Sequence, residues 1–311
     1  MGRGRGVSLA TSAESIDVVR PAAPRAGRRR LPLGWVGIAP FFVWAIAFLL
    51  IPAVALLVGA FRTDDGIWTT KFVSAIFHEP YRSAYITSIK ISLYTAVLGG
   101  TLGILIAYAA ISPKAPRFIR PAMTTFSGVA ANFGGVPLAF AFIATLGTVG
   151  AATRWLDKVG IDLYGHGFTL FGFWGIVVTY LYFQIPLMIL IIAPAIDGLR
   201  EEWREAASNL GASSWQYWRR VGLPILFPSI LGAMLLLFGS AFAAYATAYA
   251  LTSGHIELTP LQIGELIGGN VLSDPHQGYA LAVGMVIVIS VTMAFYFVLE
   301  RRASRWRRRA S

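Results

Sequence analysis

The sequence has no cysteine and few charged residues among its 311 positions. Without cysteine, the chain can form no disulfide, no thiolate nucleophile and no Cys-ligated metal site. Only 13% of the residues are charged and 56% are hydrophobic, with a mean hydropathy of +0.64, whereas about a quarter of a soluble domain is charged. Much of the protein surface therefore cannot face water, which excludes a soluble enzyme, a disordered protein and a coiled coil.

Long segments lack Asp, Glu, Lys and Arg altogether. A transmembrane helix needs about 20 apolar residues to cross the hydrocarbon layer of about 30 Å, and six charge-free segments exceed that length. They are Leu31–Phe61, Ile91–Pro113, Pro121–Thr153, Leu163–Ile196, Val221–Ile256 and Pro275–Leu299. The sequence therefore predicts an all-α membrane protein with six transmembrane helices.

The third charge-free segment is interrupted by Gly134-Gly135-Val136-Pro137. Proline removes a backbone donor and glycine loosens a helix, so we expect a break at this point. Two interpretations stay open. Either the membrane helix tolerates Pro137 with a kink, or the interruption is a break that lines a transport path.

Lys and Arg are distributed unequally between the two sides that six spans define. The side holding both termini carries 20 of the 26 basic residues, in the segments 1–34, 112–120, 197–224 and 300–311. The positive-inside rule predicts that this side is cytoplasmic, which explains the net charge of +11 without a nucleic-acid partner. We expect a multi-pass membrane protein with both termini in the cytoplasm. Residues 1–34 are expected to form a disordered basic tail.

The predicted cytoplasmic segment 197–224 combines acids, bases and tryptophan. Residues 199–210 favour a helix, and Gly211 is suited to end it because glycine accepts a positive φ. Ser213 can cap a second short helix, and Pro224 suits the first turn of the next span. An interfacial hairpin would explain the Trp and Arg residues, whereas the glutamates of the segment suit docking to a basic protein surface.

One pattern in this segment resembles a family motif. Glu205-Ala206-Ala207 is followed after three residues by Gly211 and after nine more by Val221-Gly222-Leu223-Pro224. This spacing resembles the EAA loop of binding-protein-dependent ABC importer permeases, where the position of Val221 is isoleucine. The resemblance implies the type I ABC importer permease fold with a cytoplasmic coupling helix. Its expected parts are a first helix and external loop at 35–85, a core permease domain at 86–299 and a basic cytoplasmic tail at 300–311.

The same resemblance implies a transport subunit of the bacterial plasma (inner) membrane that is not itself an enzyme. Two permease subunits, the second a different but related chain, would form the pathway within membrane lipid. Two ATPase subunits would hold ATP and Mg²⁺, and an extracytoplasmic binding protein would deliver the solute. The residues implied in ATPase coupling are Glu205, Ala206, Ala207, Gly211, Leu223 and Pro224. The sequence has no Gly-x-x-x-x-Gly-Lys-Ser/Thr phosphate loop, so we expect no cofactor bound by this chain.

Polar residues within predicted spans are candidates for the solute pathway, because such groups usually face the bundle interior or a water-filled path. Asn132 lies beside the glycine–proline break, and Gln184 lies two residues before Pro186, with Tyr180 one turn earlier. Each could instead make a hydrogen bond between helices. The four histidines are not paired at ligand spacing, so we expect neither a metal site nor catalytic residues.

The substrate is the least specified property. The predicted external segments hold 8 acids and 6 bases, a balance that favours a cationic solute. The long first external loop and the stretch Asn132-Phe133-Gly134-Gly135-Val136-Pro137 also resemble the polyamine, ferric-iron, thiamine and phosphonate branch of the family. We therefore expect a spermidine/putrescine-type permease, with those other solutes or a sugar as alternatives. Two other classes of protein are disfavoured. A secondary transporter would usually need a charge within a span, whereas the six predicted spans come from charge-free segments. An intramembrane enzyme would need a catalytic pair, and the histidines are not paired.

Overall fold

The structure is a computed structural model that describes residues 2, 34–111, 116–165, 167–253, 255–268 and 274–309. The predicted tail at 1–34 lies outside these residues apart from its glycines 2 and 34. The described part of the chain is helical, with one isolated antiparallel bridge between Arg62 and Trp68. The elements are α1 (Gly34–Ala45), the π-helical turn η1 (Ile46–Leu50), α2 (Ile51–Gly59), α3 (Lys71–Ala75), α4 (Tyr81–Ile111), α5 (Ile119–Asn132), α6 (Gly135–Leu146), α7 (Ala151–Lys158), α8 (Phe173–Asp197), α9 (Glu201–Asn209), α10 (Ser214–Tyr217), the π-helical turn η2 (Trp218–Gly222), α11 (Leu223–Phe242), α12 (Ala246–Thr252), α13 (Thr259–Ile267) and α14 (Pro275–Arg309).

Six helical segments of the described chain are long and apolar enough to cross a membrane. They are Gly37–Gly59, Tyr81–Ile111, Gly135–Lys158, Phe173–Asp197, Ser214–Phe242 and Pro275–Leu299. The predicted fold class, an all-α membrane protein with six transmembrane helices, is confirmed. The chain divides into two compact units, residues 1–52 and 53–311, and every contact described below lies within the second unit.

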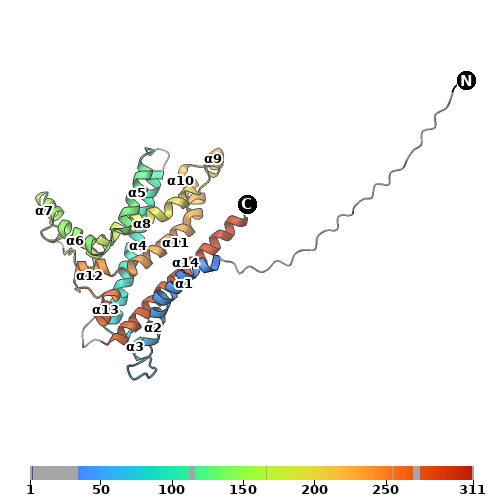
Figure 1. Cartoon of the computed structure of the whole chain (residues 1–311). Helices are drawn as coiled ribbons and strands as arrows, with labels where there is room; N and C mark the ends of the chain where they lie inside the picture. Colours follow the sequence, from blue (N-terminus) through green and yellow to red (C-terminus); the bar gives the residue numbers. More distant parts are fainter. Residues whose placement is uncertain are drawn as a thin grey trace. The chain divides into compact units, whose positions relative to one another are not determined.

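The centre of the second unit is formed by α4, α8 and α11, which pack against one another (Figure 1). Glycines on α4 permit the close approach of its neighbours. A Cβ on Gly99 would lie 2.8 Å from the Cβ of Gln184, and one on Gly103 would lie 2.5 Å from the Cβ of Met188. Small residues spaced by four allow membrane helices to meet at their backbones, so these two glycines set the α4–α8 distance.

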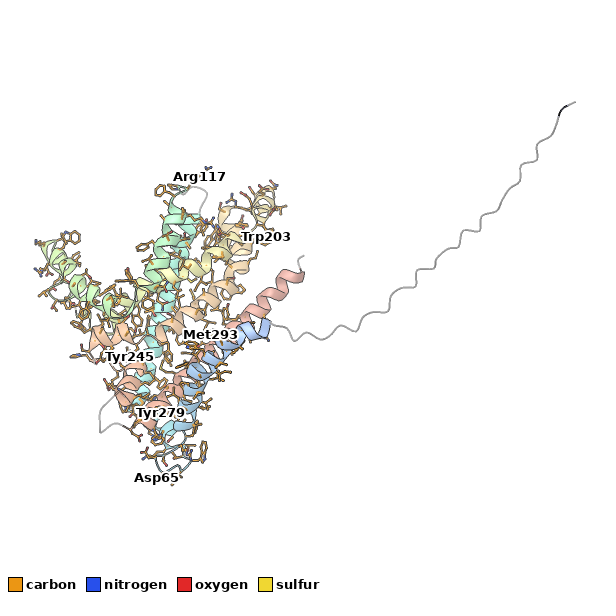
Figure 2. The ribbon with its side chains drawn as sticks, in the orientation of Figure 1. Asp65, Arg117, Trp203, Tyr245, Tyr279 and Met293 are labelled. Atoms are coloured by element: carbon orange, nitrogen blue, oxygen red, sulfur yellow. The ribbon has the colours of Figure 1, made fainter. Side chains whose placement is uncertain are left out.

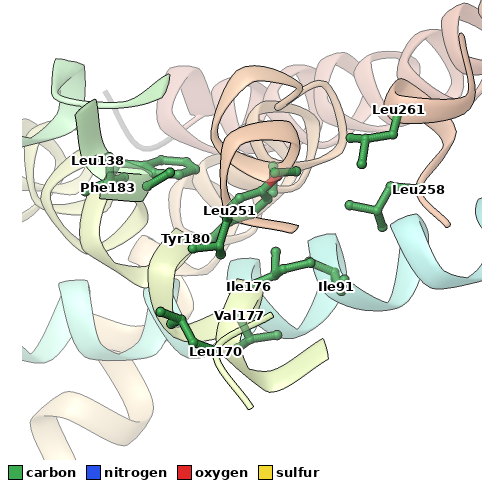
Figure 3. Packing of buried hydrophobic residues seen from close by; sticks show 13 residues of the cluster. Ile91, Leu138, Leu170, Ile176, Val177, Tyr180, Phe183, Leu251, Leu258 and Leu261 are labelled. Atoms are coloured by element: carbon green, nitrogen blue, oxygen red, sulfur yellow. The ribbon is translucent and has the colours of Figure 1, made fainter. Parts of the chain in front are cut away.

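A second packed region joins α8 to the shorter helices. Its buried residues, drawn in Figure 3, come from α4, α6, α8, α11, α12, α13 and the segments just before α8 and α13, and they include Leu138, Tyr180, Phe183 and Leu251. Tyr180 and Leu251 are each 1% exposed. This cluster packs α6 and α12 against the side of α8. Both α6 and α12 begin just after an interruption in a predicted span.

The two ends of the α4–α8 pair are distinct. The end of α8 differs from its start, because Asp197 there forms an ion pair with Arg120 of α5. Tyr94 of α4 contacts Trp174 near the start of α8, and Gly103, later in α4, lies against Met188, later in α8. The two helices therefore run parallel. Figure 2 shows Arg117 and Trp203 toward one end of this unit and Asp65 at the opposite end. Arg117 and Trp203, which come from two of the predicted cytoplasmic segments, therefore share a side, as the sequence predicts.

The last helix continues beyond the membrane-length segment. The charge-free part of α14 ends at Leu299, and the helix extends through the basic residues to Arg309. Near its start, His276 contacts both the carbonyl oxygen of Gly59 through Nδ1 at 2.8 Å and Asp64 through Nε2 at 3.0 Å. The beginning of α14 is thereby attached to the segment that follows α2.

Candidate functional site

The segment 197–224 forms the two short helices that its sequence predicts. The first, α9, is closed by a left-handed residue, Gly211, with φ of +74°. The N–H of Ala212 donates to the carbonyl of Ala207 at 3.0 Å, and the N–H of Gly211 donates to that of Ser208 at 2.9 Å. These two bonds form a Schellman motif, which satisfies the carbonyls at a helix end and requires the left-handed residue.

The second short helix begins with a capping box. The Ser213 side chain accepts the N–H of Gln216 at 3.2 Å, and the Gln216 side chain accepts the N–H of Ser213 at 2.8 Å. From Ser214 the helix continues through η2 into α11 as far as Phe242, and Pro224 lies in the first turn of α11. The short helix and the membrane-length helix are therefore one continuous element.

Aromatic contacts attach this element to the core of the unit. Trp218 meets Tyr108 of α4 edge to face with ring centroids 4.8 Å apart, and Tyr217 is 6% exposed. The ring of Trp218 also lies over Gly222, where a Cβ would come within 2.8 Å of it. These contacts orient the loop, so its free surface faces away from the helices.

That free surface carries both apolar and acidic residues. Leu210 is 88% exposed and Trp215 is 69% exposed. Glu205 is exposed, and in the described part of the chain it forms no ion pair, whereas Glu201 pairs with Arg204 at 3.4 Å. Exposed large apolar side chains are typical of a protein-docking surface, and an unpaired acid on the same loop can bind a basic partner group. We call Glu205, Leu210 and Trp215 with the helices that carry them the docking loop.

The predicted break in the third span is present. Helix α5 ends at Asn132, and α6 begins at Gly135, whose φ is +73°. The N–H of Gly135 donates to the hydroxyl of Thr247 on α12 at 2.8 Å. The backbone group released by the break is thus satisfied by a neighbouring helix, as membrane-embedded backbone requires.

A second break separates α11 from α12 at residues 243–245. The hydroxyl of Tyr180 donates to the carbonyl of Ala244 at 3.0 Å, and Nε2 of Gln184 donates to the carbonyl of Leu237 at 2.9 Å. Both side chains extend from α8 into its contact with α11. Gln184 is fully buried, and its Oε1 has no hydrogen-bond partner in the described residues.

The two breaks border one cavity of about 250 Å³. It is lined by Ala131, Asn132, Gly134, Gly135, Phe183, Ser240, Ala244, Tyr245, Ala246 and Thr247. Of the predicted pathway residues, Asn132 is exposed and lies at this cavity, where its Nδ2 donates to the carbonyl of Gly128 at 2.8 Å. Tyr180 and Gln184 do not line it. Sequence reasoning missed Ser240 and Thr247, although the fifth charge-free segment, Val221–Ile256, is longer than a single span requires.

Among the described residues that line the cavity, none is Asp, Glu, Lys, Arg or His. The cavity offers amide, hydroxyl and backbone groups, which hydrogen-bond a solute without neutralising a charge. The described residues also contain no cluster of His, Asp and Glu arranged to hold a metal ion. The groups at the two breaks can therefore form hydrogen bonds with a polar solute.

Six apolar helices, a neutral polar cavity at two helix breaks and a projecting docking loop define a multi-pass membrane permease subunit. Residues 99–305 match the family described as "Binding-protein-dependent transport system inner membrane component", and the chain belongs to this family. It is thus a permease subunit of an ABC importer.

Individual relatives agree with this family. The chain is 25% identical over 256 residues to the "Probable sulfate transport system permease protein cysT" of Nephroselmis olivacea, covering 81% of this chain and 86% of that protein. It is 24% identical over 278 residues to the "Spermidine/putrescine transport system permease protein PotB" of Haemophilus influenzae, covering 87% and 95%. The fold is similar to that of a chain in the crystal structure of a bacterial alginate ABC transporter in complex with an alginate-pentasaccharide-bound periplasmic protein, with a TM-score of 0.65, 19% identity, and 88% and 94% coverage. These relatives are transport proteins rather than enzymes.

Proposed function

We propose that the docking loop couples this permease to a separate ATPase. The observation that carries the proposal is the pair of terminated helices around Gly211, which presents Glu205, Leu210 and Trp215 on one rigid support. A charged anchor between exposed apolar side chains fits a groove lined by basic and apolar residues. Because the loop continues into α11, a displacement of the loop moves a membrane helix with it.

The proposed assembly contains two ATPase subunits, a second, related permease chain and an extracytoplasmic solute-binding protein. The docking loop and both termini face the cytoplasm, since 20 of the 26 Lys and Arg residues fall on that side. A complex with a periplasmic protein is stated for the alginate transporter of similar fold. ATP and Mg²⁺ belong to the ATPase subunits in this proposal, and this chain contributes the coupling residues and half of the pathway.

The cavity at the two helix breaks is the proposed position of the solute path in this subunit. Asn132 supplies an amide to the passing solute, and Tyr180 holds the wall by its bond to the carbonyl of Ala244. Gln184 bonds the carbonyl of Leu237 on α11, outside the cavity lining. Breaks in membrane helices occur where the backbone lines a cavity. A pair of breaks that are hydrogen-bonded to each other can change shape together when α11 moves.

For the substrate we propose a polyamine, with sulfate as the second candidate. The match to the spermidine/putrescine permease covers 95% of that protein, and the predicted external segments are slightly acidic, which favours a cation. Sulfate is favoured by the similarity to the sulfate permease, and a neutral cavity can hydrogen-bond an oxyanion as well. Uptake of labelled putrescine and labelled sulfate is compared in cells with and without the chain. Loss of sulfate uptake alone on deletion would overturn the polyamine proposal.

Coupling is tested by replacing Glu205 with alanine. Losing a charged partner at a desolvated interface costs about 2–5 kcal/mol, so Glu205→Ala is expected to leave membrane insertion intact and to reduce both ATPase co-purification and uptake. Glu202→Ala is the matched control, because Glu202 is an exposed acid of the same helix and, in the described chain, forms no ion pair. Equal ATPase recovery by both variants would contradict the anchoring role.

The proposed orientation has its own test. Ser208 is exposed in the docking loop, and a cysteine placed there becomes the single thiol of a chain that has none. A membrane-impermeant maleimide is expected to label Ser208→Cys only after the cells are opened. Labelling in intact cells would place the docking loop outside and would overturn the coupling proposal.

A further inference from the structure

A second cavity, of about 460 Å³, lies away from the two helix breaks. It is lined by Thr87, Lys90 and Tyr94 of α4 and by Phe173 and Trp174 at the start of α8. The three α4 residues are spaced by three and four positions, so they share one face of the helix. This cavity belongs to the end of the α4–α8 pair opposite the docking loop, and neither the coupling nor the solute path uses it.

The cavity combines one cation with three aromatic rings. Tyr94 meets Trp174 and Phe173 edge to face at 5.6 and 5.7 Å, and Phe173 meets Trp174 at 5.3 Å. Tyr94 is 46% exposed and Trp174 is 54% exposed, so the rings form an open apolar wall. Lys90 is exposed, no Asp or Glu lines the cavity, and in the described part of the chain Lys90 forms no salt bridge.

The position of Lys90 along α4 places it at the membrane surface. The residues of α4 that follow it, 91–111, are free of charge, and their length of about 31 Å matches the hydrocarbon thickness of about 30 Å. The ammonium group is therefore at the level of the lipid headgroups, where Trp and Tyr also concentrate. A phosphodiester with attached acyl chains matches this arrangement of one cation above an apolar aromatic wall.

We propose that this cavity binds the phosphate group of a membrane phospholipid. Lys90 supplies the positive charge, Thr87, Tyr94 and Trp174 supply donors to the phosphate and glycerol oxygens, and the three rings pack against the start of the acyl chains. The site thereby attaches a specific lipid to the α4–α8 pair, whose packing fixes the core of the subunit.

The test is native mass spectrometry of the complex purified through this chain and titrated with phosphatidylglycerol in mild detergent. A single basic side chain near a membrane surface contributes about fivefold in lipid affinity, so Lys90→Gln is expected to lower phosphatidylglycerol binding by about that factor. Lys90→Arg is expected to retain it, which also distinguishes loss of charge from loss of folding. Lys158→Gln, on α7 outside the cavity, is expected to bind as the wild type does. Equal binding by the wild type and Lys90→Gln would overturn the proposal.

Two further experiments distinguish a phospholipid from other occupants of the cavity. Inorganic phosphate and sulfate are added to the delipidated complex, and a Lys90-dependent adduct of either anion without any Lys90-dependent lipid adduct would assign the cavity to a free oxyanion and overturn the lipid. A photoreactive Trp174→benzoylphenylalanine variant is expected to cross-link to lipid in native membranes. Cross-linking to a second protein chain alone would make the cavity a subunit interface and would also overturn the proposal.

Discussion

Gly135 and Thr247 are joined by a hydrogen bond of 2.8 Å between the backbone N–H of the first and the hydroxyl of the second. The bond connects the start of α6 with α12, which are 112 residues apart in sequence. Each residue follows a helix break, and both line the same cavity. The two interrupted spans are therefore held as a pair rather than bending independently.

Removing this bond should loosen the cavity. Thr247→Val keeps the side-chain shape and leaves the Gly135 N–H without a partner, which costs about 1–3 kcal/mol. We expect a lower thermal midpoint of the purified complex and reduced uptake. Thr145→Val is the control, since the Thr145 hydroxyl is exposed and bonds only within its own helix. A Thr247→Val complex as stable as this control would show that the bond does not hold the breaks together.

Gly211 should resist substitution by β-branched residues. Its φ of +74° is required by the Schellman motif that ends α9, and a non-glycine residue in this region costs about 1–2 kcal/mol. Gly211→Val is expected to displace α10 and to lower ATPase co-purification. Asparagine tolerates the left-handed region better, so Gly211→Asn should recover much of the binding. If both variants bind ATPase as the wild type does, the turn does not position the docking loop.

The α4–α8 distance should depend on Gly103. A Cβ at this position would lie 2.5 Å from the Cβ of Met188, and such overpacking costs about 1–3 kcal/mol. Gly128 is also inside a helix, but a Cβ there would meet nothing within 4 Å. Alanine favours the helix over glycine by about 1 kcal/mol at both sites. We expect Gly103→Ala to lower the thermal midpoint and Gly128→Ala to maintain or raise it; the reverse order would disprove the close approach.

Asn132 and Gln184 should differ in their effect on transport. Asn132→Ala removes an amide from the cavity and is expected to reduce solute uptake with little change in stability. Gln184→Met removes a helix–helix hydrogen bond worth about 0.6 kcal/mol together with a buried oxygen that has no partner in the described residues. It should therefore change stability little and retain uptake. Loss of uptake in Gln184→Met alone would move the solute path into the α8–α11 contact.

The number of membrane helices and the form of the docking loop could be predicted because local physics decides them. Charges are costly in hydrocarbon, so their absence marks the spans. Gly211 and Ser213 carry their own turn and cap chemistry and fold as expected. The break at Gly134 is likewise visible as a glycine–proline cluster, and the structure places it where the cluster predicts.

The cavity could not be predicted to the same degree. The break at 243–245 lies in an alanine-rich stretch without proline or glycine, so no local signal marks it. The group that stabilises this break lies on another helix, since the Tyr180 hydroxyl of α8 donates to the freed carbonyl of Ala244. Whether Gln184 faces a path or a neighbouring helix depends on the rotation of α8, which the packing of Gly99 and Gly103 determines. The spacing of residues in the sequence does not determine the rotation of α8.

The uninterrupted helix from Ser214 to Phe242 spans about 43 Å. Trp215 occupies its first turn, and the break that borders the cavity follows its last. In the proposed coupling, the Trp218–Tyr108 contact holds this helix near its first turn. A tilt that an ATPase imposed on the exposed first turn would then be carried through the π-helical turn η2 and past Pro228 to the break beside the cavity.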